Sequence, residues 1–422
     1  MDLKVRVLLV MTVAAATLWL GGCGHYVCDH TFGNATCTAS GSGFSSGGGS
    51  SGSASAYVYA VDQNGTVDGY QLATSSSTFG SISSYTAPTI ASNDFGVGMV
   101  VAQGKFVYAA LAAQNQLYGW SVSSSGALTA LSGFPLTIST MAGTIANFAY
   151  NQQVLITNPS GTLLFLSEFG DEEIYVYQIN STSGALTAVS GSPFSTLGAT
   201  LEPDNMAMDG LGKYLYVTES SDDHSGSFIG IYSVSSSGAL TQVGTGNYED
   251  SIWEFAGEPS GKYMIGISGK TAFFYGQDDP HIYVYSINQS TGALTLASTN
   301  TTTYAPFNIA VSPVATNGTF VYSFSINDTD TGIYPVEGYQ LNTTTGTLTA
   351  LSGSPFSNIA TGYWGQLDQA GSNLIVYSTA TSGSGTITQL GALAVGSSGG
   401  LTQSAAAATL STPGYWVVTD PN

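Results

Sequence analysis

The sequence predicts an all-β protein, a seven-bladed β-propeller whose blades are four-stranded and antiparallel. Two observations support this fold class: the composition and a repeat of about 50 residues. Of 422 residues, 53 are Gly, 25 are Tyr and 18 are Phe, whereas charged residues make up only 8%. Such a composition favours strands and turns, and the scarcity of Lys, Arg and Glu disfavours surface helices. Hydrophobic residues make up 43% of the chain, which is enough for a large core rather than a disordered chain.

The repeat is clearest at 174–187 and 282–295, which both run from an aromatic strand to Gly-Ala-Leu-Thr. Weaker copies lie at 119–129, 230–241, 338–349 and 391–402, and a degenerate first copy lies at 69–82. The hydrophobic residue that marks each copy is Phe79, Leu128, Leu186, Leu240, Leu294, Leu348 or Leu401. Their spacings are 49, 58, 54, 54, 54 and 53 residues. Near-equal repeats of this length are typical of four-stranded propeller blades and not of a two-sheet sandwich.

Each repeat is expected to contain strands a to d, counted outward from the axis. In the fourth copy these strands are predicted at 205–209, 214–219, 229–233 and 240–243, with a hairpin turn at Ser237-Gly238. The first repeat begins at strand b, at Tyr57, whereas residues 413–422 have a strand-a pattern with nothing after it. The C-terminal strand is therefore expected to complete the first blade and close the ring.

The N-terminus has the pattern of an export signal. Lys4 and Arg6 precede an apolar run at 7–20, which is too short to span a membrane as a helix. The run ends in Leu20-Gly21-Gly22-Cys23, which resembles a bacterial lipobox with Cys23 as the lipidated residue. We therefore expect a signal peptide at 1–22 and a lipid anchor in the cell envelope, on the periplasmic or the outer side. The alternative is an ordinary signal peptide with an incidental cysteine.

The anchor is followed by a predicted tether at 23–56, and the propeller is predicted at 57–422. Cys28 and Cys37 are the remaining cysteines, and an exported setting makes a disulfide between them plausible. Residues 38–55 are nearly all Gly, Ser, Ala and Thr, a composition typical of a flexible linker.

The charge balance excludes one class of partner. The formal net charge is −20, and no arginine follows Arg6. A chain of this charge repels nucleic acid and anionic lipid headgroups. We expect a monomer that does not bind DNA or RNA.

The segment 212–241 reads Gly-Lys-Tyr-Leu-Tyr-Val, then Ile-Tyr-Ser-Val, then Ser-Gly-Ala-Leu-Thr. This pattern resembles the repeat of the lactonase family of seven-bladed propellers, which includes enzymes similar to 6-phosphogluconolactonase, and the resemblance covers about 57–422. It implies the fold more strongly than the activity, because the matching residues belong to hairpins and core strands. Family enzymes for phosphorylated substrates are expected to use arginine and histidine. This propeller has no arginine and only His224 and His281, so phosphogluconolactone is not the expected substrate.

Most carboxylates are predicted on one face, in the b–c and d–a loops that surround the channel mouth. These are Asp62, Asp68, Asp94, Glu168, Asp171, Glu172, Glu173, Glu202, Asp204, Glu219, Asp222, Asp223, Glu249, Asp250, Glu254, Asp278, Asp279, Asp328 and Asp330. The a–b and c–d turns are mostly Ser, Thr and Gly. This asymmetry favours a functional face, although charged residues also gather in loops for solubility alone.

The innermost strands supply a second candidate site. Equivalent strand-a positions are predicted at Val97, Val154, Asn205, Glu254, Asn308, Trp364 and Trp416. Polar groups from blades four to six beside aromatic residues from blades seven and one suit a small ligand. Asn205, Glu254 and Asn308 also resemble the single-Ca²⁺ centres of calcium-dependent propeller hydrolases, in which oxygen ligands hold the ion. A register error of one residue would instead point these side chains into the blades.

Two functions remain open from the sequence. The first is binding at the acidic face, with a cation, a small carbohydrate or another envelope protein as the partner. The second is hydrolysis of an uncharged sugar lactone. In that reaction Glu254 would act as base or ion ligand, His224 or His281 would carry the proton, and Trp364 and Trp416 would stack on the ring. The alternative for these residues is that the tryptophans belong to the core and the histidines are solvent-exposed.

Overall fold

The structure is a computed structural model. It describes residues 54–62, 66–73, 79–82, 85–86, 96–111, 115–138, 154–168, 172–197, 201–221, 227–246, 252–268, 280–312, 318–325, 335–357, 359, 364–382, 385–409 and 414–419. The signal peptide, Cys23, Cys28, Cys37 and His224 lie outside these residues. Within the described ranges, no helix has the length and apolarity needed to cross a membrane.

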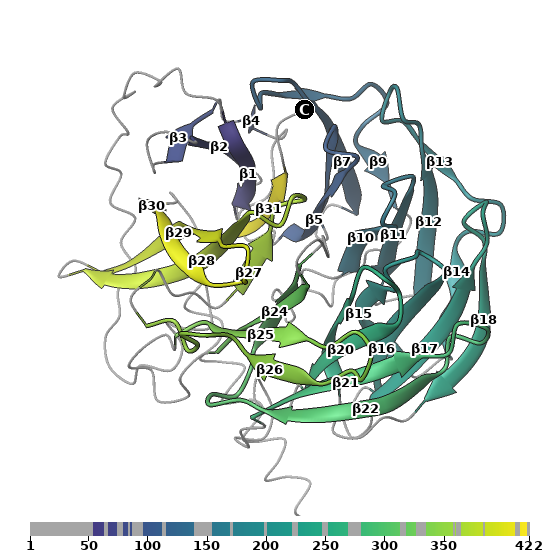
Figure 1. Ribbon diagram of the computed structural model, residues 1–422. Coiled ribbons are helices and arrows are strands. Elements are labelled where there is room, and N and C mark those ends of the chain that lie inside the picture. Colours follow the sequence, from purple (N-terminus) through teal and green to yellow (C-terminus); the bar gives the residue numbers. More distant parts are fainter. Residues whose placement is uncertain are drawn as a thin grey trace, which may run out of the picture.

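The described residues form seven antiparallel sheets arranged in a ring, as Figure 1 shows. This arrangement confirms the predicted seven-bladed propeller. Blade 1 contains, from the axis outward, β31 (Gly414–Thr419), β1 (Ala54–Asp62), β2 (Thr66–Ala73) and β3 (Phe79–Ser81), with β4 (Tyr85–Thr86) also paired to β2. Blade 2 contains β5 (Gly96–Ala102), β6 (Phe106–Leu111), β7 (Gln116–Val122) and β8 (Leu128–Ala130), with β9 (Leu136–Thr137) paired to β7.

The next two blades follow the same order. Blade 3 contains β10 (Leu155–Thr157), β11 (Leu163–Glu168), β12 (Glu173–Ile179) and β13 (Leu186–Ala188), with β14 (Phe194–Ser195) paired to β12. Blade 4 contains β15 (Leu201–Met208), β16 (Tyr214–Ser221), β17 (Ser227–Val234) and β18 (Leu240–Gly246).

Three further blades complete the ring. Blade 5 contains β19 (Ile252–Gly257), β20 (Tyr263–Ser268), β21 (His281–Ile287) and β22 (Leu294–Thr301). Blade 6 contains β23 (Asn308–Val311), β24 (Thr319–Phe324), β25 (Glu337–Leu341) and β26 (Leu348–Ala350). Blade 7 contains β27 (Trp364–Leu367), β28 (Asn373–Ser382), β29 (Gly385–Val395) and β30 (Leu401–Thr409).

The ring closes as predicted, because β31 pairs antiparallel with β1, with Tyr57 opposite Thr419 and Asp62 opposite Gly414. The seven residues that mark the repeats are the first residues of the outer strands β3, β8, β13, β18, β22, β26 and β30. The first strand begins at Ala54, slightly before the predicted start at Tyr57.

Glycines of the c–d turns pack against aromatic side chains of the preceding blade. Gly292, in the Gly-Ala-Leu-Thr of blade 5, has a φ of +75°, and a Cβ there would lie 2.6 Å from the ring of Tyr214 in blade 4. The hydroxyl of Tyr216 donates a hydrogen bond of 2.9 Å to the carbonyl of the same glycine. The repeat motif therefore places a bare backbone against an aromatic ring of the preceding blade.

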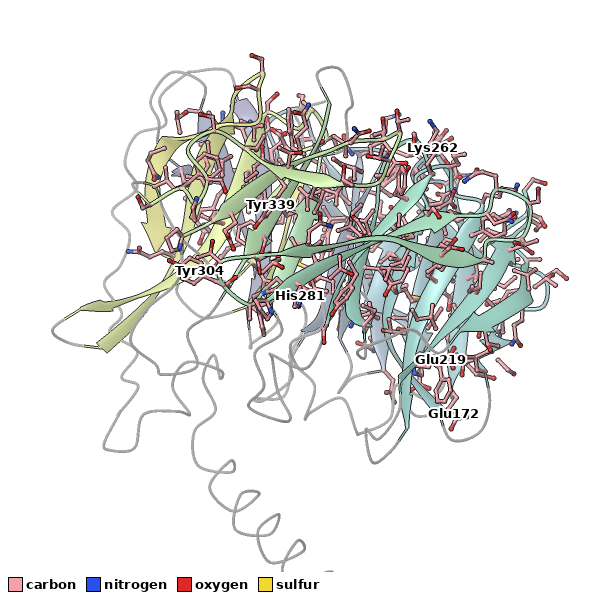
Figure 2. All side chains as sticks on the ribbon, turned by 60° about the horizontal axis from the view of Figure 1, so that its bottom comes forward. Glu172, Glu219, Lys262, His281, Tyr304 and Tyr339 are labelled. Carbon is pink, nitrogen blue, oxygen red and sulfur yellow. The ribbon has the colours of Figure 1, made fainter. Side chains whose placement is uncertain are left out.

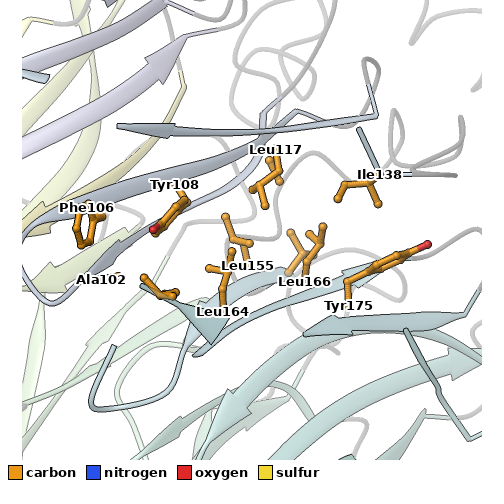
Figure 3. Close-up of a cluster of buried hydrophobic side chains, with 12 residues drawn as sticks. Ala102, Phe106, Tyr108, Leu117, Ile138, Leu155, Leu164, Leu166 and Tyr175 are labelled. Carbon is orange, nitrogen blue, oxygen red and sulfur yellow. The ribbon is translucent and has the colours of Figure 1, made fainter. Parts of the chain in front are cut away.

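The core lies between blades. One buried cluster, drawn in Figure 3, joins β6 and β7 of blade 2 to β10 and β11 of blade 3, and includes Tyr108, Leu117, Leu155, Leu164 and Leu166. Because each sheet packs its apolar side chains against both neighbours, the inner strands are held in a fixed ring around the axis.

Buried carboxylates order the a–b turns. Asp209 is fully buried, and its Oδ1 accepts the backbone N–H groups of Lys213 and Tyr214, both at 2.6 Å. Glu258 and Asp368 occupy the same place in blades 5 and 7. The repeat pattern alone does not single out these three acids, although each precedes a turn glycine by three residues.

Candidate functional site in the inner wall

The inner strands carry the predicted polar positions. Asn205 lies opposite Thr218, Glu254 opposite Ile267, Asn308 opposite Phe324 and Trp364 opposite Tyr377. Each of these partners is the fifth residue of its b strand, counted from the position of Tyr214 in blade 4. The predicted alignment therefore holds for these four residues.

The alignment is off by one residue in two blades. In blade 2, Gly98 and not Val97 takes the equivalent register position, opposite Ala110. In blade 1 that position belongs to Tyr415, opposite Val61, whereas Trp416 lies opposite Ala60. The side chain of Trp416 lies outside the described residues, so its predicted stacking role stays a prediction.

Glu254 is the buried acid of the inner wall. It lies on β19 just after a β-bulge, and only 6% of the residue is exposed. Its Oε1 accepts a hydrogen bond of 2.9 Å from Nδ2 of Asn308, and its carboxyl also accepts the backbone N–H of Ile309. Burial raises the pKa of Glu254 to about 8, and the two hydrogen bonds only partly oppose this shift. The carboxyl is therefore mostly protonated at neutral pH.

Asn308 links three blades. Its Nδ2 reaches Glu254 in blade 5, and its Oδ1 accepts the backbone N–H of Gly365 in blade 7 at 3.0 Å. Gly365 has no room for a side chain, because a Cβ there would lie 1.9 Å from the ring of Phe324. Both Glu254 and Asn308 thus accept a backbone N–H from the inner strand of the following blade. This satisfies donors that an edge strand would otherwise leave open.

Trp364 borders this polar pair. It is partly exposed, begins β27, and its ring centroid lies 5.4 Å from that of Phe307, at an interplanar angle of 47°. Phe307 immediately precedes Asn308, so an aromatic surface and the Glu254–Asn308 pair occur together on blades 5 to 7. An aromatic ring beside convergent polar groups is suited to a small ring compound.

Asn205 is buried on β15, the neighbouring inner strand. Its backbone N–H donates to Oγ1 of Thr218 at 3.0 Å.

This arrangement is a poor fit for calcium. Glu254 and Asn308 together offer one carboxyl group and one amide oxygen that already accepts a hydrogen bond from Gly365, whereas calcium takes about six to eight oxygen ligands. Among the described residues, no three His, Cys, Asp or Glu side chains gather into a metal-binding group. Calcium at Asn205, Glu254 and Asn308 stays a prediction of the sequence, and no step of the proposed function depends on it.

His281 does not lie beside Glu254. It begins β21, the third strand of blade 5, and pairs with Thr301. Glu254 and His281 are thus two strands apart, a backbone separation of about 10 Å. The ring of His281 is half-buried near Tyr283, with centroids 6.1 Å apart. The other predicted proton carrier, His224, lies outside the described residues.

The ring has two opposite faces. The mouth face is the end of the ring at the b–c and d–a connections, and the turn face is the end at the a–b and c–d turns. Figure 2 shows Glu172, Glu219 and His281 toward one side and Lys262 toward the other. Six of the carboxylates predicted on the mouth face have described side chains, and three of these, Glu168, Glu219 and Glu254, are buried. The acidic composition of this face therefore has a partly structural origin.

These features define the class of the molecule: a seven-bladed β-propeller with a polar segment, Glu254 and Asn308, in its inner wall. No protein-family model and no curated protein matches the chain. Among solved structures, a candidate 6-phosphogluconolactonase from Bacteroides fragilis is similar, with a TM-score of 0.58, 15% identity, and coverage of 88% of this chain and 100% of that one.

Two further structures are similar. A protein from Lactobacillus plantarum has a TM-score of 0.56 and 12% identity, over 86% of this chain and 99% of that one. A candidate 6-phosphogluconolactonase from Bacteroides uniformis has a TM-score of 0.52 and 16% identity, over 70% and 80%. The predicted resemblance to lactonase-like propellers is confirmed for the fold. At these identities the likeness says nothing of the activity.

Proposed function

We propose that the protein is an envelope-anchored propeller that binds an uncharged, hydroxylated ring compound, a sugar or a sugar lactone, at the inner strands of blades 5 to 7. The observation that carries this proposal is the hydrogen-bonded pair of Glu254 and Asn308 beside the partly exposed Trp364. A protonated carboxyl can donate a hydrogen bond to a hydroxyl or carbonyl oxygen, and a tryptophan ring packs against the apolar face of a sugar.

The charge of the molecule favours a neutral ligand. The net charge is −20, and arginine is absent after Arg6, so a phosphate or carboxylate would meet repulsion and no bidentate partner. The candidate 6-phosphogluconolactonases share the fold, but the residues of this chain do not support a phosphorylated ligand.

A second candidate is hydrolysis of such a lactone, and the raised pKa of Glu254 favours it. With its pKa of about 8, the deprotonated carboxylate could take a proton from water as the oxygen of that water bonds to the lactone carbonyl carbon. The bond from that carbon to the ring oxygen then breaks, and the ring oxygen receives the proton. Activity should therefore rise with pH through about 8.

Calorimetric titration with unphosphorylated aldoses and aldonolactones tests the binding proposal. Asn308→Ala should weaken binding by about tenfold or more, because it removes the hydrogen bond from Nδ2 of Asn308 that orients the carboxyl of Glu254. Asn180→Ala, in an exposed c–d turn of blade 3, is the matched control and should bind as the unaltered protein does. Absence of binding by the folded protein would overturn the proposal and direct attention to an envelope protein as the partner.

Lactone turnover is measured on the same panel. Glu254→Gln resembles the protonated acid and should retain binding but lose turnover, while Glu173→Gln should retain both. Turnover that survives Glu254→Gln would exclude Glu254 as the base.

The anchor is tested separately. The full chain should partition into the detergent phase on Triton X-114 separation, and Cys23→Ala should move it to the aqueous phase. Aqueous partitioning of both proteins would show that there is no lipid at Cys23.

A further inference from the structure

Both ends of the described propeller lie at the turn face. The first strand, β1, begins at Ala54, which pairs with Ala73 at the c–d end of β2. The last strand, β31, ends at Thr419, opposite Tyr57. The N-terminal tether therefore joins the ring at the turn face and not at the mouth face.

The exposed charges of the described turn face are lysines. Lys105, Lys213 and Lys262 lie in the a–b turns of blades 2, 4 and 5, and all three are exposed. Nζ of Lys213 also donates to the carbonyl of Gln289 and lies 5.2 Å from the ring centroid of Tyr214.

The carboxylates of the same turns are turned inward. Asp209 and Glu258 are completely buried, and Asp368 is 1% exposed. Each accepts backbone N–H groups of its own turn. The lysines are therefore the charges that this part of the surface presents to solvent. Asp420 and the two residues after it lie outside the described residues.

The two faces are electrostatically separate. β1 has nine residues, so the faces are about 30 Å apart. Salt screens exposed charges beyond about 8 Å at physiological ionic strength. A surface that approaches the turn face therefore meets its lysines, and the distant carboxylates of the mouth face contribute little. The net charge of the whole chain, which predicts repulsion from anionic lipid, does not describe this face.

We propose that the turn face docks on an anionic lipid surface through Lys105, Lys213 and Lys262, so that the mouth face points away from the membrane. The inference rests on the lipid anchor at Cys23, which is part of the proposed function. For a flexible linker, which the composition of residues 38–55 predicts, the root-mean-square length from Cys23 to Ala54 would be about 30 Å, and this would keep the turn face close to the bilayer. The docked orientation leaves the inner-wall site open to solutes of the surrounding compartment.

The test uses the lipidated full chain in vesicles, with Cys28 and Cys37 replaced by Ser. A dye is placed at Ser236→Cys, in an exposed c–d turn of the turn face, or at Thr301→Cys, beside His281 at the mouth face. Energy transfer to a lipid-bound acceptor then reports the distance of each face from the membrane. With phosphatidylglycerol vesicles, transfer should be strong from Ser236→Cys and weak from Thr301→Cys. The difference should shrink with neutral phosphatidylcholine vesicles or at high salt.

The combined variant Lys105→Gln, Lys213→Gln and Lys262→Gln separates docking from tethering. Its ratio of docked to undocked protein should fall on the order of a hundredfold. Flotation of the protein with the vesicles in a density gradient reports the anchor independently. If the protein floats but neither this variant nor salt changes the energy transfer, docking is overturned and the anchor stands. If the protein does not float, the anchor fails, and docking is then judged by binding of the unlipidated chain to phosphatidylglycerol vesicles at low salt. Absence of that binding overturns docking as well.

Discussion

Blades 4 and 6 hold a buried carboxylate at the same place by different means. In blade 4 the acid is Glu219 on β16, the b strand, and its carboxyl accepts the backbone N–H of Leu197 at 3.0 Å and the hydroxyl of Tyr232 at 3.2 Å. In blade 6 the acid is Glu337 on β25, the c strand. It accepts the backbone N–H groups of Thr303 and Tyr304 and the hydroxyl of Tyr339.

The residue that faces each acid is small. Gly230 on β17 is the counterpart of Glu337, and Ser325 after β24 is the counterpart of Glu219. Tyr232 and Tyr339 occupy the same position, and in each case burial and the adjacent carboxylate raise the pKa of the tyrosine. In both blades the backbone N–H groups of the segment that enters the blade therefore need a buried acceptor. The acid that accepts these hydrogen bonds can come from the b strand, as in blade 4, or from the c strand, as in blade 6.

A large loss of stability is expected from Glu337→Ala. The change leaves two backbone N–H groups and one tyrosine hydroxyl without an acceptor, which should lower the free energy of unfolding by about 3 to 4 kcal/mol. Glu219→Ala leaves one N–H and one hydroxyl and should cost about 2 to 3 kcal/mol. Urea denaturation measures both. The control is Glu173→Ala, a half-buried acid at the start of β12, which should change stability by about 0.5 kcal/mol or less. If Glu337→Ala lowered the free energy of unfolding no more than the control does, the backbone N–H groups of Thr303 and Tyr304 would not need this acid as acceptor.

The outer hairpins could be predicted from the sequence because their signals are local. Leu240 and Leu294 each follow a Gly-Ala pair, and the turn glycine requires the positive φ that the structure shows at Gly238 and Gly292. The paired acids of blades 4 and 6 could not be predicted in this way. They are far apart in the repeat pattern, and only the register of β16 with β17 and of β24 with β25 shows that they fill equivalent space.

The inner wall was predictable wherever the a–b turns have equal length. Counting back from the turn glycine placed Asn205, Glu254 and Trp364 correctly. It failed in blade 2, where Gln103 and Gly104 both have positive φ and make the turn one residue shorter. At Trp416 there is no following a–b turn from which to count, because β31 and β1 are joined by backbone pairing and not by a turn.

The contribution of Glu254 to the free energy of unfolding should depend on pH. The folded-state pKa of Glu254 is about 8, above its ordinary value of 4.5, so the folded protein binds this proton more tightly than the unfolded chain does. Stability from this group is therefore complete below about pH 4.5 and is lost as pH rises to about 8. The loss should approach about 1.4 kcal/mol for each pH unit in that interval.

Glu254→Gln removes this titration and keeps the shape of the neutral acid. The difference in unfolding free energy between the unaltered protein and this variant should be small near pH 5 and should favour the variant by a few kcal/mol near pH 9, an interval that brackets the pKa of about 8. Urea denaturation across this range measures the difference, in which the titration of the other carboxyl groups cancels. A difference that does not vary with pH would mean that Glu254 is ionised in the folded protein under all these conditions, and it would remove the argument for a neutral ligand.

The smallest effect is a coupling between Gly230 and Glu219. A Cβ on Gly230 would lie 2.7 Å from Oε1 of Glu219 and 2.7 Å from the ring of Tyr232, so Gly230→Ala should cost about 2 kcal/mol. In a Glu219→Ser background the first clash is absent, and the same change should cost about 1 kcal/mol less. Gly244→Ala, where the nearest atom would lie at 3.6 Å, is the matched control and should show no such coupling. Equal costs in both backgrounds would mean that the tyrosine ring alone excludes a side chain at Gly230. Blade 6 argues against that outcome, since Glu337 and Tyr339 occupy the corresponding positions together.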